Sequence, residues 1–198
     1  MSKVVASFTM SLDGYSAGPD QTLENPLGIG AKTLHRWLFD GADDNQAETA
    51  ALLGHGAFIM GRNMFGPIRG EWDLDWRGWW GEEPPYHGPV FVLTHHQREP
   101  LVMSGGTTFH FVTDGIASAL GQARQAAGDK SISIAGGAST VRQYLNLGAV
   151  DELNIQLSPM FLGAGERPLD GLQGVILTST YARYTPLATH LRYLVSKT

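Results

Sequence analysis

The alternation of short apolar strands with helical segments constrains the fold of this chain more than any other feature. Four β-branched or aromatic runs indicate buried strands. They are AFIMG (57–61), VFVLT (90–94), TTFHFVT (107–113) and SISIA (131–135). Helical patterns follow two of them, at 114–130 and 138–150. Such alternation predicts a mostly parallel sheet covered by helices, joined by right-handed crossovers.

The two ends of the chain add further strands and a long loop. The strand KVVASFTMS (3–11) is followed by a glycine-rich segment, 12–30, and by helical patterns at 31–40 and 43–56. Near the other end, DELNIQLSPM (151–160) reads as a strand. The last strands, 174–185 and 189–197, are joined by a short turn and predict an antiparallel hairpin at the edge of the sheet.

Composition narrows the class of protein. The length of 198 residues suits a single domain, 1–198, and the formal net charge of −5 with no long basic run argues against a nucleic-acid partner. The absence of cysteine excludes disulfides and cysteine-zinc sites, and the seven histidines show no metal-binding spacing, so we expect no metal. No apolar run suggests a signal peptide or a membrane span, so we expect a cytoplasmic enzyme or binding protein.

The most suggestive motif is SISIAGGASTVRQY (131–144), in which a strand runs through Gly136 and Gly137 into a helix. A helix N-terminus presents free N–H groups and favours an anion, and glycine lets a phosphate approach the backbone. Ser139 and Thr140 would add hydroxyl groups. The alternative is a tight turn with an N-cap, and the dinucleotide fingerprint G-x-G-x-x-G is absent.

Two other strands are also followed by residues that could bind a phosphate. FIMGRNMFG (58–66) places Arg62 just after a strand that ends in Gly61, where its guanidinium would pair with phosphate unless it is simply a surface arginine. VFVLTHHQ (90–97) places Thr94 and His95 just past another strand end, where ligands of open α/β sheets bind.

Asp13 lies in MSLDGYSAG (10–18), where the first strand leaves the sheet. Its carboxylate would organise a proton or anchor a polar substrate, or it would only close an Asp-Gly turn. The segment SPMFLGAGERPLDG (158–171) would close over a ligand or simply connect two strands. Candidates for a substrate-facing wall, with core packing as the alternative, are Tyr15, Trp72, Trp76, Tyr86 and Phe161. We interpret the tryptophan-rich segment 66–89 as an ordered surface loop.

Taken together, these motifs resemble the dihydrofolate reductase-like superfamily. The motif SLDG and the later LSPMFLGAGERPL are similar to its branch formed by the reductase domain of the bifunctional riboflavin-biosynthesis deaminase-reductase. The resemblance spans roughly residues 3–196. It implies a three-layer α/β/α fold with a central mixed, mostly parallel sheet, NADPH as hydride donor, and a homodimer. The chain has no H-x-E and P-C-x-x-C deaminase signature.

The resemblance also implies where the cofactor lies. Its pyrophosphate would face Gly136, Gly137, Ala138, Ser139 and Thr140. From the other side, the phosphates would meet Gly61, Arg62 and Asn63. The adenosine 2′-phosphate would lie at Thr94 and His95, and the nicotinamide near Asp13. True dihydrofolate reductases carry a helix-borne carboxylate, and none of four candidates stands out here: Asp40, Asp43, Asp44 and Glu48.

These expectations converge on an NADPH-dependent reductase that transfers hydride to a C=N or C=O group of a small heterocyclic or sugar-like substrate. A protein that binds NADP(H) without turnover, as a sensor or assembly partner, is the alternative. A structural interaction module would have no affinity for NADPH.

Overall fold

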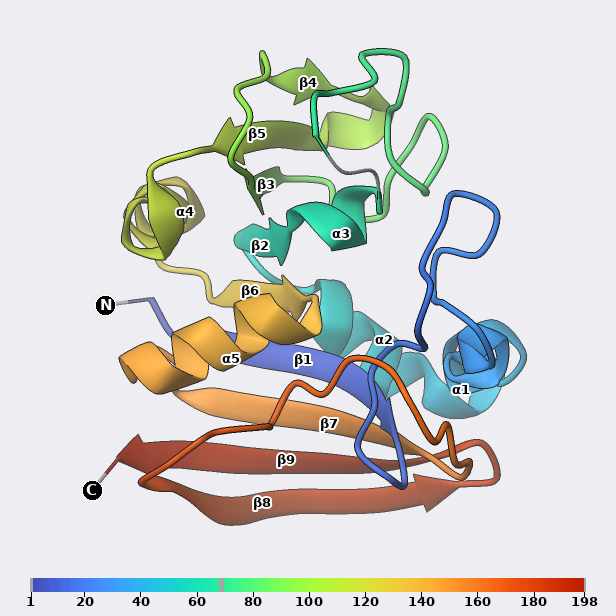
Figure 1. The fold of residues 1–198 in the computed structure, drawn as a ribbon. Coiled ribbons are helices and arrows are strands. Elements are labelled where there is room, and N and C mark those ends of the chain that lie inside the picture. The colour runs from blue at the N-terminus through green and yellow to red at the C-terminus, as the bar shows by residue number, and fades with distance from the viewer. Residues whose placement is uncertain (1, 68–69, 198) are drawn as a thin grey trace.

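The structure is a computed structural model, and it describes residues 2–67 and 70–197. Within these residues nine strands form one mixed sheet in the order β4-β5-β3-β2-β6-β1-β7-β9-β8 (Figure 1). The strands are β1 (Val4–Ser11), β2 (Ala57–Gly61), β3 (Pro89–Leu93), β4 (Leu101–Val102), β5 (Thr108–Val112), β6 (Ile132–Gly136), β7 (Glu152–Ser158), β8 (Val175–Thr185) and β9 (Ala188–Lys197).

The six strands from β5 to β7 in this order are parallel, whereas β4, β9 and β8 run antiparallel to their neighbours. This confirms the mostly parallel sheet and the C-terminal hairpin that the sequence predicts. β4 was not predicted, because two residues are too few to form a recognisable pattern.

The helices are shorter at the start of the chain than the sequence suggests. They are α1 (Arg36–Phe39), α2 (Gln46–Leu53), α3 (Arg62–Phe65), α4 (Gly115–Ala127) and α5 (Ala138–Leu147). The predicted helices 31–40 and 43–56 each open with a 3₁₀ turn, at Ala31–Thr33 and Asp43–Asn45. A further 3₁₀ turn spans Ser104–Gly106.

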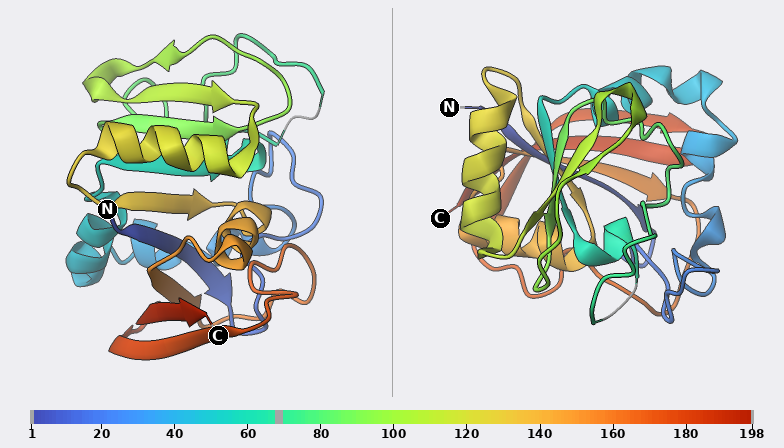
Figure 2. Two further views of the ribbon diagram at one scale, coloured as in Figure 1. Left: turned by 90° about the vertical axis from the view of Figure 1, so that its left-hand side faces the viewer. Right: turned by 90° about the horizontal axis from the view of Figure 1, so that it is seen from above.

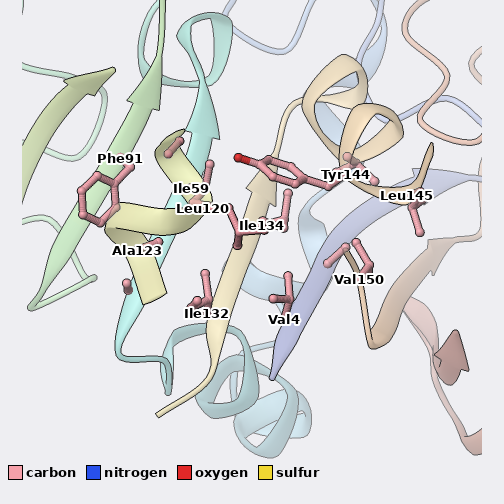
Figure 3. Packing of buried hydrophobic residues seen from close by; sticks show 14 of the residues in the cluster. Val4, Ile59, Phe91, Leu120, Ala123, Ile132, Ile134, Tyr144, Leu145 and Val150 are labelled. Carbon is pink, nitrogen blue, oxygen red and sulfur yellow. The ribbon is translucent and has the colours of Figure 1, made fainter. Parts of the chain in front are cut away.

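Helices cover both faces of the sheet, which confirms the three-layer α/β/α fold. α4 and α5 lie on one face, and α1 and α2 lie on the other (Figure 2). The core under α4 and α5 is apolar, and Ile59, Ile132 and Ile134 of the sheet meet Leu120 and Tyr144 of the helices there (Figure 3). The Tyr144 hydroxyl donates a hydrogen bond to the carbonyl of Ile116 and so ties α5 to α4 (2.8 Å).

A second apolar cluster lies on the opposite face of the β4-to-β2 half of the sheet. Phe58, Met60 and Phe109 form its floor, and the tryptophan-rich segment packs Trp72 and Trp80 over them. Residues 68–69 of that segment lie outside the described part of the chain. The segment is therefore a packed covering of the sheet, since its aromatic rings bury large apolar areas.

Candidate functional site

The carboxyl ends of β2 and β6 lie side by side and are held closely against the start of α5. Met60 pairs with Gly136 across the two strands. A Cβ on Gly61 would lie 2.5 Å from Oγ1 of Thr140, a distance that real Cβ atoms do not show. Glycine at position 61 is therefore what lets the first turn of α5 approach the end of β2.

The turn between β6 and α5 is open on its outer side. Gly136 has φ of 130°, a backbone conformation that favours glycine, and the Gly136–Gly137 peptide bond is cis. A Cβ on Gly137 would meet no atom of the described residues within 4 Å. Space therefore exists directly against the backbone at the N-cap of α5.

The N-terminus of α5 offers hydrogen-bond donors to this space. The bond from Val141 N–H to the Gly137 carbonyl (3.1 Å) closes the first turn, and no side chain in residues 2–67 or 70–197 caps the helix. The N–H groups of Ala138, Ser139 and Thr140 precede that bond and have no acceptor within the helix. With the helix dipole they favour an anionic group, so this cradle suits a pyrophosphate.

Arg62 begins α3 directly after β2, and its guanidinium lies over the ring of Trp72 (3.9 Å to the ring centroid). It also donates a hydrogen bond to the carbonyl of Glu71 (3.2 Å). The indole N–H of Trp72 in turn donates to the carbonyl of His96 (2.8 Å). Trp72 thus connects Arg62 to the loop after β3.

The loop after β3 contains the other predicted phosphate contacts. Gly61 pairs with Leu93, so Thr94 follows at the same edge of the sheet as the glycine cradle. The buried Thr94 hydroxyl accepts a hydrogen bond from His96 N–H (3.1 Å), which shapes a tight turn and leaves His95 exposed. The structure therefore brings Gly61, Arg62 and Thr94 to one edge with the turn after β6, and Asn63 lies in α3 beside them.

Asp13 fastens the loop after β1 to the loop after β7. Its carboxylate accepts hydrogen bonds from the Ser11 hydroxyl (2.6 Å) and from the backbone N–H groups of Leu162 (3.0 Å) and Gly163 (2.7 Å). These bonds lower the pKa of Asp13 from 3.8 to about 2. At neutral pH the group is an anion with its acceptor positions occupied, which suits an anchor better than a proton donor.

The same two loops are joined at further points that the sequence did not reveal. Glu166 makes two backbone hydrogen bonds of 2.8 Å around an isolated bridge to Ala17: its carbonyl accepts from Ser16 N–H, and its N–H donates to the Ala17 carbonyl. Arg167 stacks on the ring of Tyr15 (4.2 Å) and donates to its hydroxyl (3.0 Å). The segment 158–171 is thus held against the loop after β1, and Tyr15 is partly covered by a guanidinium.

The aromatic candidates for a substrate-facing wall separate into two groups. Phe161 is 75% exposed next to Leu162, beside the Asp13 anchor. Tyr86 is only 7% exposed and contacts Phe58 and Phe109 in the second core, so the structure places it inside the molecule instead of at the site. Burial also raises the pKa of its hydroxyl.

Trp72 and Trp76 pack over the second core and use their indole N–H groups on backbone carbonyls. Trp76 donates to the carbonyl of Phe65 (2.9 Å), as Trp72 does to His96. Trp72 lies at the Arg62 and His96 side of the edge, beside the ends of β2 and β3, which are two and three positions from β1 in the sheet order. Both rings therefore support the loops around the cradle.

Glu48 of α2 is the buried member of the four acidic candidates. It accepts hydrogen bonds from the Tyr181 hydroxyl (2.9 Å) and the Arg183 guanidinium (3.0 Å) of β8. Burial alone would raise the pKa of Glu48, but these donors outweigh it and the net pKa is lowered. Glu48 fixes α2 to the hairpin, and its partners lie too far along the sequence for the pattern to reveal them.

The sheet face beneath α2 is polar and hollow. Several buried side-chain atoms there have no hydrogen-bond partner in the described part of the chain, among them Ser7 Oγ, Asn154 Oδ1, Gln156 Oε1 and His190 Nδ1. A groove of about 640 Å³ opens beside them and is lined by Lys3, Ser131 and Glu152, among others. Because these residues mark the starts of strands, the groove lies at the opposite ends of the strands from the glycine cradle.

None of the helices that the structure describes has the length and apolar character needed to cross a membrane. Within residues 2–67 and 70–197, no three histidine or acidic side chains are grouped so that they would hold a metal ion.

The mixed sheet and the helices that cover it have the dihydrofolate reductase-like α/β fold, which solved structures share. The chain belongs to the RibD C-terminal domain family, whose model matches residues 2–189. No curated protein sequence matches the chain.

Solved structures share this fold at low sequence identity. A Shewanella sp. PV-4 protein named for riboflavin biosynthesis is 22% identical, with a TM-score of 0.66 over 98% of this chain and 99% of that one. Enterococcus faecalis dihydrofolate reductase, solved with NADP(H), is 12% identical, with a TM-score of 0.57 over 98% and 97%.

One of the similar solved structures belongs to a longer protein. The Thermotoga maritima diaminohydroxyphosphoribosylaminopyrimidine deaminase/5-amino-6-(5-phosphoribosylamino)uracil reductase is 13% identical, with a TM-score of 0.59 over 98% of this chain. This chain spans 56% of the length of that protein.

Proposed function

We propose that this protein is an NADPH-dependent reductase that transfers hydride to a C=N or C=O group of a small heterocyclic or sugar-like substrate. The observation that carries the proposal is the open glycine cradle at the start of α5, held against the end of β2 by the Gly61–Thr140 contact. Membership of the RibD C-terminal domain family supports it, as does the NADP(H) complex of the structurally similar Enterococcus enzyme.

Each part of the site has a role in this proposal. The N–H groups at the start of α5 bind the pyrophosphate across the open side of Gly137. Arg62 adds positive charge from the neighbouring strand, and Thr94 and His95 form the end that meets the adenosine 2′-phosphate. When bound, NADPH supplies the hydride, while the protein orients the reactants and excludes water.

Asp13 acts as a positioning residue in this proposal. Its pKa of about 2 keeps the carboxylate ionised at neutral pH, and its bonds to Leu162 and Gly163 hold the exposed Phe161 beside the end of β1. Phe161 is then the aromatic surface available to a planar substrate.

The second candidate function is NADP(H) binding without turnover. One observation favours it. The carboxylates of Asp13 and Glu48 each accept several hydrogen bonds from other parts of the chain, and the pKa of each is lowered. Neither is free to donate a proton at neutral pH.

Incubation of the protein with NADPH and a panel of pterin, flavin-precursor and quinone substrates separates these functions. We expect NADPH absorbance to fall with at least one substrate, and NADPH to raise the melting temperature more than NADH does. A rise in melting temperature without oxidation across the panel would support the binding function. No thermal shift with either nucleotide would overturn both.

A further inference from the structure

One side chain of the tryptophan-rich segment, Trp72, contacts basic groups that follow two neighbouring strands. The Arg62 guanidinium lies 3.9 Å from the centroid of its ring, and the Arg98 guanidinium lies 5.3 Å from it. Arg62 begins α3 directly after β2, whereas Arg98 lies between β3 and β4. Because β2 and β3 are paired, this indole ring connects two adjacent strand ends at the edge that contains the glycine cradle.

The contact with Trp72 orients the Arg62 side chain. A guanidinium that stacks on an aromatic face is attracted to the ring, while its N–H groups point outward in its own plane. One of these N–H groups donates to the carbonyl of Glu71, the residue before Trp72 (3.2 Å). The long arginine side chain is thus ordered before a ligand binds, which lowers the entropy cost of binding an anion beside it.

The indole N–H of Trp72 fixes the turn after β3. It donates to the carbonyl of His96 (2.8 Å), and the His96 N–H donates to the Thr94 hydroxyl (3.1 Å). His95 lies between these two bonded residues and is exposed. One indole therefore holds both Arg62 and the turn that carries His95, so these two basic side chains belong to the same end of the site.

Trp72 is itself firmly supported. Its ring packs edge-on against Phe111 of β5, with 4.9 Å between the ring centroids. The Arg98 guanidinium donates to the carbonyls of Leu74 (3.0 Å) and Trp76 (2.8 Å), which ties the backbone after Trp72 to the segment after β3. A supported ring positions its neighbours more precisely than a mobile one, because little motion is left to transmit to them.

We propose that Trp72 is the positioning residue for the adenosine 2′-phosphate and so sets the preference of this protein for NADPH over NADH. This inference rests on the proposed function, since it deepens the same cofactor site. The 2′-phosphate is the group that distinguishes NADPH from NADH. A residue that orients basic side chains around it therefore affects the binding of NADPH more than that of NADH. Trp72 acts through Arg62 and through the turn that carries His95.

Calorimetric titration with NADPH and NADH tests this role. Trp72→Leu removes both the aromatic face and the N–H group, so we expect it to weaken NADPH binding about tenfold and NADH binding less than about threefold. Trp72→Phe restores the face alone and should recover part of the loss. Trp76→Phe is the matched control, because Trp76 lies in the same segment and donates its indole N–H to the Phe65 carbonyl instead. The ratio of the two dissociation constants should be unchanged in this control.

The double variant Arg62→Ala/Trp72→Leu shows whether Trp72 acts through its neighbour. We expect Trp72→Leu to reduce NADPH affinity by a smaller factor in the Arg62→Ala protein than in the unmodified protein, because the side chain that it orients is absent. An equal factor in both proteins would contradict positioning through Arg62. If Trp72→Leu does not fold by circular dichroism, Trp72→Phe serves as the test. An unchanged ratio of dissociation constants in Trp72→Phe would then overturn the inference.

Adenosine 2′,5′-bisphosphate and adenosine 5′-monophosphate separate this inference from the proposed function. The two probes differ only in the 2′-phosphate and lack the nicotinamide. We expect the unmodified protein to bind the bisphosphate more tightly and Trp72→Leu to lose most of that difference. If the unmodified protein binds NADPH but Trp72→Leu weakens both probes equally, the role of Trp72 is wrong and the proposed function stands. If the unmodified protein binds neither NADPH nor the bisphosphate, the proposed function fails, and this inference fails with it.

Discussion

The Cβ that Gly61 lacks would lie 2.5 Å from Oγ1 of Thr140. One residue ends β2 and the other lies in the first turn of α5, so this contact sets how closely the helix N-terminus approaches the sheet edge. The proposed pyrophosphate cradle depends on that approach, because its N–H donors belong to the same turn.

Gly61→Ala should lower the free energy of unfolding by about 1–3 kcal/mol, since an added methyl group would force the helix away from the strand. Thr140→Ala removes the obstructing atoms, so the double variant should be less destabilised than the sum of the single changes. Urea unfolding of the four proteins measures this coupling. If the losses in unfolding free energy of the two single variants summed to that of the double variant, the two residues would not restrain each other.

Gly137→Val should weaken NADPH binding at least tenfold and leave the melting temperature within a few degrees of the unmodified protein. A side chain there would occupy the open space where the phosphates are proposed to lie. Gly121→Val is the matched control, because Gly121 of α4 also has open space around it. Calorimetric titration measures the dissociation constant of NADPH for each protein. Unchanged affinity in a folded Gly137→Val protein would show that the turn after β6 does not bind the cofactor.

His95→Ala should narrow the preference for NADPH over NADH. His95 is exposed at the end of β3, where the 2′-phosphate is proposed to lie. Gln97→Ala changes another exposed residue of the same loop and should leave the preference unchanged. The ratio of the two dissociation constants is the measurement, and an unaltered ratio in His95→Ala would exclude His95 from the site.

Asp13→Asn should loosen the loop after β7 and change the response to acid. The folded-state pKa of Asp13 is about 2, against an ordinary value of 3.8, so its stabilising contribution is present above pH 4 and is lost as the pH falls toward 2. The Asn side chain does not titrate, so the free energy of unfolding of the variant should not show this loss between pH 4 and pH 2. Hydrogen exchange at the Leu162 and Gly163 amides should accelerate in Asp13→Asn, and unchanged protection would contradict the anchoring role.

His35 should make the protein less stable in mild acid. Burial lowers its pKa from 6.5 to about 4, so between these values the unfolded chain takes up a proton that the folded protein does not. The free energy of unfolding therefore falls as the pH falls from 6.5 to 4, by up to roughly 3 kcal/mol. His35→Leu should flatten this fall.

Denaturant midpoints at pH 7, 5.5 and 4 provide the test of the His35 prediction. Burial also lowers the pKa values of His55, His110 and His190, so a weaker dependence should remain in the variant. If the free energy of unfolding fell equally with pH in the unmodified protein and in His35→Leu, His35 would not contribute to the pH dependence.

The sequence predicted the layers and the meeting of the ends of β2, β3 and β6 at one edge of the sheet, because both depend on local pattern. Apolar runs that end in glycine identify strand ends, and parallel strands bring their carboxyl ends to one edge. The partners of Asp13 and Glu48 were not predictable in this way, because Gly163 and Arg183 lie in distant segments brought close only by the sheet. Tyr86 looked like a substrate-facing ring because aromatic clusters have the same composition in a core as in a pocket.

The place of β1 in the sheet has a consequence for how the chain is made. β1 is residues 4–11, yet its two neighbours are β6, at 132–136, and β7, at 152–158. During synthesis from the N-terminus, both edges of this apolar strand stay unpaired until β6 and β7 have left the ribosome. Native contacts so distant in sequence slow folding and lengthen exposure to aggregation. We therefore expect the nascent chain to need a chaperone until β6 and β7 emerge.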